Sequence, residues 1–144
     1  MRYNTQFRDN NFLTPTIYTQ EMSEYAEQVK YEDLPPEVVE RAKMILLHTV
    51  GAALAAKNSP VTEKVCKMSL EANNGEGGPV TVWGLGKKMS AVNAAMVMGT
   101  MADVLDWEDC SWTGHPAASV VPCAWTAAVE RHKSGKDLIT AIVV

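Results

Sequence analysis

Apolar residues recur at steps of three and four positions along most of this 144-residue chain, which is the spacing of helices that bury one face. Helix start signals divide the pattern, because proline fits a first helical turn and a serine side chain caps its free N–H groups. These signals predict helices over residues 20–30, 34–57, 59–72, 90–105 and 116–133. The chain is therefore expected to be mostly α-helical.

The second half of the predicted helix over residues 34–57 is apolar nearly all round. A helix of that kind is expected to lie between neighbours rather than on a surface. Gly51 and the alanines that follow it would let those neighbours approach closely.

One short stretch favours extended structure instead of helix. Residues 80–83 read Val-Thr-Val-Trp and precede the glycine-containing run 84–88, so we expect a short extended or hairpin element near residues 80–88. The Gly-Leu-Gly-Lys run lacks the spacing of a phosphate-binding loop, which favours a simple turn.

The two ends of the chain differ in character. Residues 1–18 carry Asn, Thr and Pro without a period and are expected to form an N-terminal arm. Residues 136–144 begin a new apolar helix or strand and stop without a cap or a polar tail. We therefore expect the sequence to be truncated at Val144, so that residues 19–144 form an incomplete all-α domain.

Composition narrows the class of protein. The chain is 47% hydrophobic and 21% charged, as soluble globular chains are, and its net charge is -4. Its basic residues are scattered, which argues against a nucleic-acid partner. No segment approaches the roughly 18 apolar residues of a membrane span, and the N-terminus does not resemble a signal peptide. We expect a cytoplasmic protein without membrane contact.

The chain has three cysteines, Cys66, Cys110 and Cys123, and none forms a CxxC pair. An odd number without that spacing argues against a disulfide framework, a zinc ribbon or an iron–sulfur cluster. Free thiols are expected.

Candidate chemistry gathers in one acidic segment. Asp103, Asp106 and Asp109 lie three residues apart, and would share one side of a helix if the helix continued that far. Glu108 lies among them, and His115 follows a few residues later. A solvated helix end is one interpretation of this cluster.

A second interpretation is a proton-transfer site. Trp107 and Trp112 flank the acids, and aromatic neighbours suggest a partly enclosed setting in which a carboxyl group can act as a base. A divalent cation held by carboxylates is a third interpretation, although neither the calcium-loop pattern nor histidine spacing for zinc is present. Cys110 with His115 as its base would be a fourth.

Four segments together resemble the MmgE/PrpD family, whose members include 2-methylcitrate dehydratase, cis-aconitate decarboxylase and an iminodisuccinate epimerase. The resemblance runs from about Leu34 to Val144, and its most specific part is LDWEDC followed by GHP. It implies the helical N-terminal domain of the family fold, without the second, α+β domain, and a homodimer or association with the remainder of the same enzyme. The four segments are LPPEVVERAKMILLHTVGAALAA, VWGLGKKMSAVNAAMVMGTMADVLDWEDC, GHPAASVVPCAWTAAVE and SGKDLITAIVV.

By this resemblance, Asp106 and His115 are catalytic residues, and Cys110 and Asp109 bind substrate. The implied enzyme is a lyase that acts on a small polycarboxylate and uses neither a cofactor nor a metal. Charge develops beside a carboxylate in such chemistry, so a base and an electrostatic sink are both needed. His115 is expected to act as general base or acid, and Asp106 to orient it or to exchange protons itself.

The expected reaction is that of a 2-methylcitrate dehydratase-like hydro-lyase. Decarboxylation of the cis-aconitate type and epimerisation on the same scaffold are the nearest alternatives. A non-catalytic helical module for assembly or binding is the alternative from another class. The 144-residue chain alone is expected to be inactive, because further site residues of the family would lie beyond Val144.

Three positions depart from the family pattern. His48 stands where an aspartate is common, Met98 where Asn-Gly is usual, and Cys110 where the decarboxylase branch carries a threonine. The thiol of Cys110 would bind a substrate oxygen more weakly than a hydroxyl does. In addition, a polyanionic substrate would be repelled if all four carboxylates faced it, so some must point away, carry a proton or be outweighed by cations.

Overall fold

The computed structural model describes residues 15–72, 77–111 and 114–144. Its described helices and strands confirm a mostly α-helical chain. Apart from a single 3-10 turn over Tyr31–Asp33, the helices are α1 Pro15–Gln28, α2 Pro36–Ala55, α3 Pro60–Ala72, α4 Ala91–Asp103, α5 Pro116–Glu130 and α6 Gly135–Val143. The strands are β1 Val80–Thr81 and β2 Lys88–Met89.

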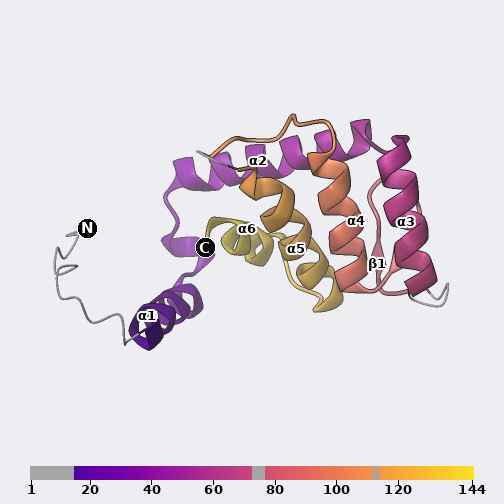
Figure 1. Cartoon of the computed structure of the whole chain (residues 1–144). Coiled ribbons are helices and arrows are strands. Elements are labelled where there is room, and N and C mark those ends of the chain that lie inside the picture. The colour runs from indigo at the N-terminus through magenta and orange to yellow at the C-terminus, as the bar shows by residue number, and fades with distance from the viewer. Residues whose placement is uncertain (1–14, 73–76, 112–113) are drawn as a thin grey trace.

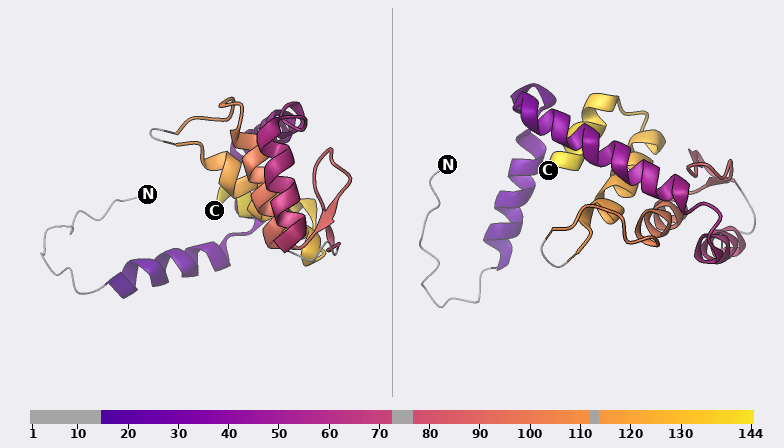
Figure 2. Two further views of the ribbon diagram at one scale, coloured as in Figure 1. Left: turned by 45° about the vertical axis from the view of Figure 1, so that its right-hand side comes forward. Right: turned by 90° about the horizontal axis from the view of Figure 1, so that it is seen from above.

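Helix α2 is the long helix against which several of the other helices pack. It contacts α4, α5 and α6, while α3 packs on the outer side of α4. Helices α4 and α5 form the closest pair in the fold. Helix α1 projects away from these elements in every view (Figures 1 and 2). The chain between α4 and α5 runs beside α2, and this is the acidic segment (Figure 1).

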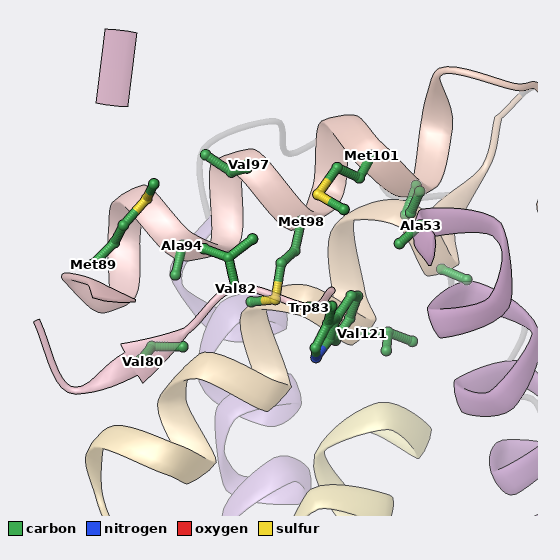
Figure 3. Close-up of a cluster of buried hydrophobic side chains, with 13 residues drawn as sticks. Ala53, Val80, Val82, Trp83, Met89, Ala94, Val97, Met98, Met101 and Val121 are labelled. Atoms are coloured by element: carbon green, nitrogen blue, oxygen red, sulfur yellow. The ribbon is translucent and has the colours of Figure 1, made fainter. Parts of the chain in front are cut away.

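The main core lies between α2, α4, α5 and the hairpin (Figure 3). Met98 and Met101 of α4 are fully buried, and the flexible side chain of Met98 lies next to Trp83, whereas Met101 lies nearer Ala53 (Figure 3). The Trp83 ring meets the Trp125 ring edge to face, with 5.6 Å between centroids. This packing fixes the end of α4, from which the acidic segment departs.

The expected hairpin near residues 80–88 is present. Strands β1 and β2 pair in antiparallel register, with Val80 opposite Met89. Gly84 and Gly86 both have φ near +65°, a conformation that glycine adopts without strain. The glycines therefore serve a turn, as their spacing predicted.

Helix starts follow the serine signals. Ser59, Ser90 and Ser134 each accept a bond from the backbone N–H three residues on, and so cap α3, α4 and α6. Ser134, which directly follows the helix predicted over residues 116–133, thus begins α6, and Asp137 completes a capping box with it. The apolar residues 136–144 are consequently helical rather than extended.

Several boundaries and faces differ from expectation. Helix α1 begins at Pro15, inside the predicted arm, whose residues 1–14 lie outside the described part of the chain. Helix α5 stops at Glu130, three residues early. The second half of α2 is not enclosed on all sides, since Leu47 is 75% exposed. A pattern that is apolar all round does not reveal which sides this chain itself covers.

Among the described residues, no helix combines the length and the apolar character needed to cross a membrane.

Candidate active site

The acidic segment is a loop and not a helical extension. Helix α4 ends at Asp103, and the N–H of Asp106 donates to the Asp103 carbonyl over 2.9 Å, closing a turn. Asp106 has φ +54°, which an α-helix cannot accommodate. The hypothesis that Asp103, Asp106 and Asp109 share one helical side is therefore wrong.

A histidine on α2 anchors this loop from the side. The Nε2 atom of His48 lies 2.6 Å from the carbonyl oxygen of Trp107. Since a carbonyl can only accept, His48 donates through Nε2. An aspartate, which is common at this position in the family, could not make this bond while ionised. In the sequence, His48 was noted only as a departure from the family. In the structure it binds the backbone of Trp107, which lies in the chain between Asp106 and Glu108.

The far end of the loop positions His115. Ser111 and Gly114 form an isolated antiparallel bridge, with N–H to O distances of 2.9 and 3.2 Å. Pro116 then begins α5, which leaves His115 at the N-cap. Its side chain makes no capping bond, so the imidazole is available to other groups.

The loop brings His115 against two carboxylates. Its Nε2 atom lies 3.1 Å from Oδ1 of Asp106, and its Nδ1 atom lies 3.6 Å from Oε2 of Glu108. The structure thus places Asp106 and His115 in contact, and their catalytic roles stay predictions. Glu108 was part of the acidic cluster in the sequence but was not chosen as a site residue. Nothing periodic in a loop could have singled it out.

The two carboxylates have opposite environments. The Asp106 side chain is 85% exposed, whereas that of Glu108 is fully buried and His115 is 29% exposed. We expected the tryptophans to enclose the acids, but Trp107 is itself 61% exposed, and Trp112 lies outside the described residues. Of the two carboxylates beside His115, it is therefore Glu108 that is enclosed by the protein.

The other two expected site residues are not joined to His115. Cys110 is exposed, and Asp109 is half-buried with its Oδ1 atom unpartnered. In the part of the chain that the structure describes, no hydrogen bond or ion pair connects either one to the histidine. Their roles in substrate binding remain predictions.

Asp106, Glu108 and His115 also offer ligand atoms that lie within 4.8 Å of one another, the spacing of a possible cation site. The ring geometry counts against it. The carboxylate of Asp106 lies nearer Nε2 and that of Glu108 lies nearer Nδ1, so the two carboxylates approach different nitrogens of the ring. The arrangement fits an imidazole held between two acceptors better than a metal centre.

An open groove of about 870 Å³ runs between α4 and α5 and reaches the site. Asp103 and His115 line it where α4 ends and α5 begins, and Arg131 lies toward the other end of α5. Small residues such as Gly99 and Ala95 form much of its floor. A small molecule bound in this groove could therefore reach the imidazole of His115.

The sequence matches the profile of the MmgE/PrpD N-terminal domain over residues 20–144. The chain therefore belongs to the MmgE/PrpD family, as its motifs indicated. This is an enzyme family, and the helical architecture and the paired Asp106 and His115 are consistent with membership.

Curated relatives include the cis-aconitate decarboxylase of Aspergillus terreus, which is 30% identical over 135 residues. A cis-aconitate decarboxylase-like protein, oryM, of Aspergillus oryzae is 26% identical over 135 residues. These alignments cover 88% of this chain but only 27% and 28% of the relatives, so the chain spans about a quarter of their length. No solved structure matches the chain significantly.

Proposed function

We propose that this chain supplies the Asp106 and His115 part of the active site of a lyase that acts on small polycarboxylates. The observation that carries the proposal is the 3.1 Å contact between His115 Nε2 and Asp106 Oδ1, on a loop that borders an open groove. An imidazole beside a carboxylate can give and take a proton at neutral pH.

Both candidate reactions need such a group. In a decarboxylation the bond to a carboxylate carbon breaks, carbon dioxide leaves, the electron pair stays on carbon, and a proton replaces the lost group. In a dehydration a proton leaves carbon, and a hydroxyl group on the neighbouring carbon departs as water after taking up a proton. His115 is the proton donor or acceptor in each, with Asp106 as its partner at Nε2.

Decarboxylation is the first candidate, since the curated relatives that match along 88% of this chain are a cis-aconitate decarboxylase and a protein resembling it. Dehydration of a 2-methylcitrate-like substrate is the second. Cys110 is the reason to retain dehydration as a candidate reaction, because a thiol stands at this position in place of the threonine of the decarboxylase branch. Epimerisation and a non-catalytic role are outcomes that the assay below distinguishes.

The substrate requires positive charge that this loop lacks. Of the titratable residues that line the groove, Asp103 and Glu130 are acidic, and Arg131 is the basic residue besides His115. A polyanion would bind there only with further cations, which we place in the remaining three quarters of a family-length enzyme. The burial of Glu108 removes one of the four carboxylates from the substrate's path.

The test is product analysis with the protein expressed from its uninterrupted gene. It is incubated separately with cis-aconitate, 2-methylcitrate and iminodisuccinate, and products are identified by NMR and mass spectrometry. Release of carbon dioxide from cis-aconitate supports the first candidate, and water loss from 2-methylcitrate the second. Activity should survive prolonged EDTA treatment. Turnover of none of the three would overturn these assignments and favour the non-catalytic alternative.

A further inference from the structure

Glu108 is the most unusual residue outside the expected site. Its side chain is completely buried, yet neither carboxylate oxygen has a hydrogen-bond partner among the described residues. A buried carboxylate without a partner is costly, since it has lost water and gained nothing in return. Such a group needs a reason to remain.

The nearest candidate partner is His115. Oε2 of Glu108 lies 3.6 Å from Nδ1, which is just beyond hydrogen-bond length, and that Nδ1 atom is also buried and unpartnered. Hydrogen bonds in active sites without substrate are often this long and tighten when substrate binds. Two orphaned polar atoms facing each other can satisfy each other by a small rotation of the ring.

We propose that Glu108 is a positioning residue. Its carboxylate accepts a hydrogen bond from Nδ1–H of His115 and so leaves Nε2 free to accept or donate the transferred proton. A neutral imidazole carries one proton, and the partner of one nitrogen decides which nitrogen holds it. A carboxylate can only accept, so Glu108 keeps the proton on Nδ1. A buried carboxylate behind an imidazole fixes ring orientation and tautomer in this way in other enzymes.

The opposite side of the ring carries a competing acceptor, because Nε2 lies 3.1 Å from Oδ1 of Asp106. The Asp106 carboxylate is 85% exposed, so water and salt screen its attraction for a ring proton, whereas Glu108 is buried and is screened much less. Glu108 is immobilised by burial, and its neighbour Trp107 is tied to α2 through the His48 bond. The Glu108 carboxylate is thus held in place on one side of the ring, and the Asp106 carboxylate lies on the solvent-exposed side.

This inference deepens the proposed function and relies on His115 as the proton-transfer group. Its test needs no substrate, so it can succeed or fail independently of lyase activity. The ring nitrogens of His115 are observed by long-range ¹H–¹⁵N NMR of the histidine-labelled chain, at a pH high enough for the imidazole to be neutral. The chemical shifts of Nδ1 and Nε2 report which nitrogen carries the proton.

The wild-type chain is expected to show His115 predominantly protonated on Nδ1. Glu108→Leu fills the buried position with an apolar side chain that has no hydrogen-bond acceptor, so the Nδ1–H form should lose its predominance. Glu108→Asp keeps an acceptor on a shorter arm and should restore much of it. Asp106→Asn, which removes the other carboxylate, should leave the proton on Nδ1. Circular dichroism of each variant verifies that the helices form.

Two results would overturn the proposal. One is a wild-type His115 that carries its proton mainly on Nε2 or populates both forms as an unrestrained histidine does. The other is a folded Glu108→Leu chain with the wild-type tautomer. If the tautomer follows Glu108 but the gene product turns over none of the three acids, the positioning role stands and the proposed function falls.

Discussion

Asp106 meets two requirements at once, one of backbone and one of charge. Its φ of +54° lies in the left-handed region, which aspartate and asparagine enter more readily than other residues with a Cβ. That turn carries the carboxylate to His115, 3.1 Å away. Strained backbone is often found at functional sites, where the surrounding structure maintains it.

Substitutions can separate these two requirements. Asp106→Asn tolerates the same backbone and should leave the free energy of unfolding within about 0.5 kcal/mol of wild type. Asp106→Ala should lower it by about 1 kcal/mol, because alanine has no side chain to stabilise a left-handed conformation. Urea denaturation at neutral pH measures both. Equal stability of the two variants would show that the turn does not constrain this residue.

Sequence reasoning found part of the site. Asp106 and His115 could be predicted from the sequence because they belong to the family motif, and the structure places them in contact. The contacts of Glu108 and His48 could not be predicted, since burial in a loop and a bond to a backbone carbonyl leave no periodic pattern in a sequence. The expected enclosure by tryptophans was wrong at Trp107, because an aromatic residue near an acid can equally well face solvent.

At the scale of elements, the sequence located the starts of α4 and α5 better than their ends, whereas it placed the start of α1 too late. Ser59 and Ser90 act through local caps that the sequence spells out. The end of α4 at Asp103 has no glycine or proline to mark it, and Asp106, which follows, adopts a positive φ without being glycine. The buried face of α2 likewise depends on which neighbours are present.

Gly99 tests the closest helix pair. A Cβ added there would lie 2.9 Å from the backbone carbonyl oxygen of Ala118, so α4 and α5 would have to separate. Gly99→Ala should therefore lower the free energy of unfolding by about 1 kcal/mol or more, although alanine is the better helix former.

Gly51 in α2 provides the matched control. An added Cβ there meets nothing within 4 Å, so Gly51→Ala should raise stability by about 0.5 to 1 kcal/mol. Thermal or urea denaturation of the two variants gives the comparison. The close approach of α4 and α5 would be disproved if both substitutions stabilised the chain alike.

At the scale of the whole molecule, one exposed ion pair joins distant parts of the chain. Lys136 Nζ on α6 donates to Glu32 Oε1 on the 3-10 turn over 2.8 Å, and it lies 4.9 Å from the centre of the Tyr31 ring. The hydrogen bond from Lys136, followed by a backbone hydrogen bond and then by the charge of Lys136, lowers the pKa of Glu32, and the bond between the two side chains raises the pKa of Lys136.

This pair should make stability depend on acid pH. A lowered pKa in the folded state means that Glu32 stabilises the fold above its ordinary value of 4.5, and that this contribution is lost as the pH falls through the lowered value. Glu32→Gln should therefore reduce the loss of Tm on acidification below about pH 4.5. Lys136→Met should do the same, and high salt should shrink both effects because the pair is exposed. Unchanged pH profiles in both variants would show that the pair contributes nothing.

The exposed apolar residues also belong to this scale. Leu47 and Val92 are 75% and 79% exposed, on α2 and α4. At the end of the chain, Leu138 and Ile139 are buried, whereas Val144 is 48% exposed. Exposed large apolar side chains therefore occur on several helices, and Met22 on α1 is 72% exposed as well.

The central claim is that His115 transfers the proton in a lyase reaction. The measurement is steady-state kinetics of His115→Ala in the full gene product, on the acid that the wild-type enzyme turns over. His132→Asn serves as the control, since His132 is exposed after α5 and its φ of +52° suits asparagine. We predict that kcat falls by about a hundredfold or more in His115→Ala, with an unchanged circular dichroism spectrum, and stays near wild type in the control. Near-normal kcat in His115→Ala would contradict the claim.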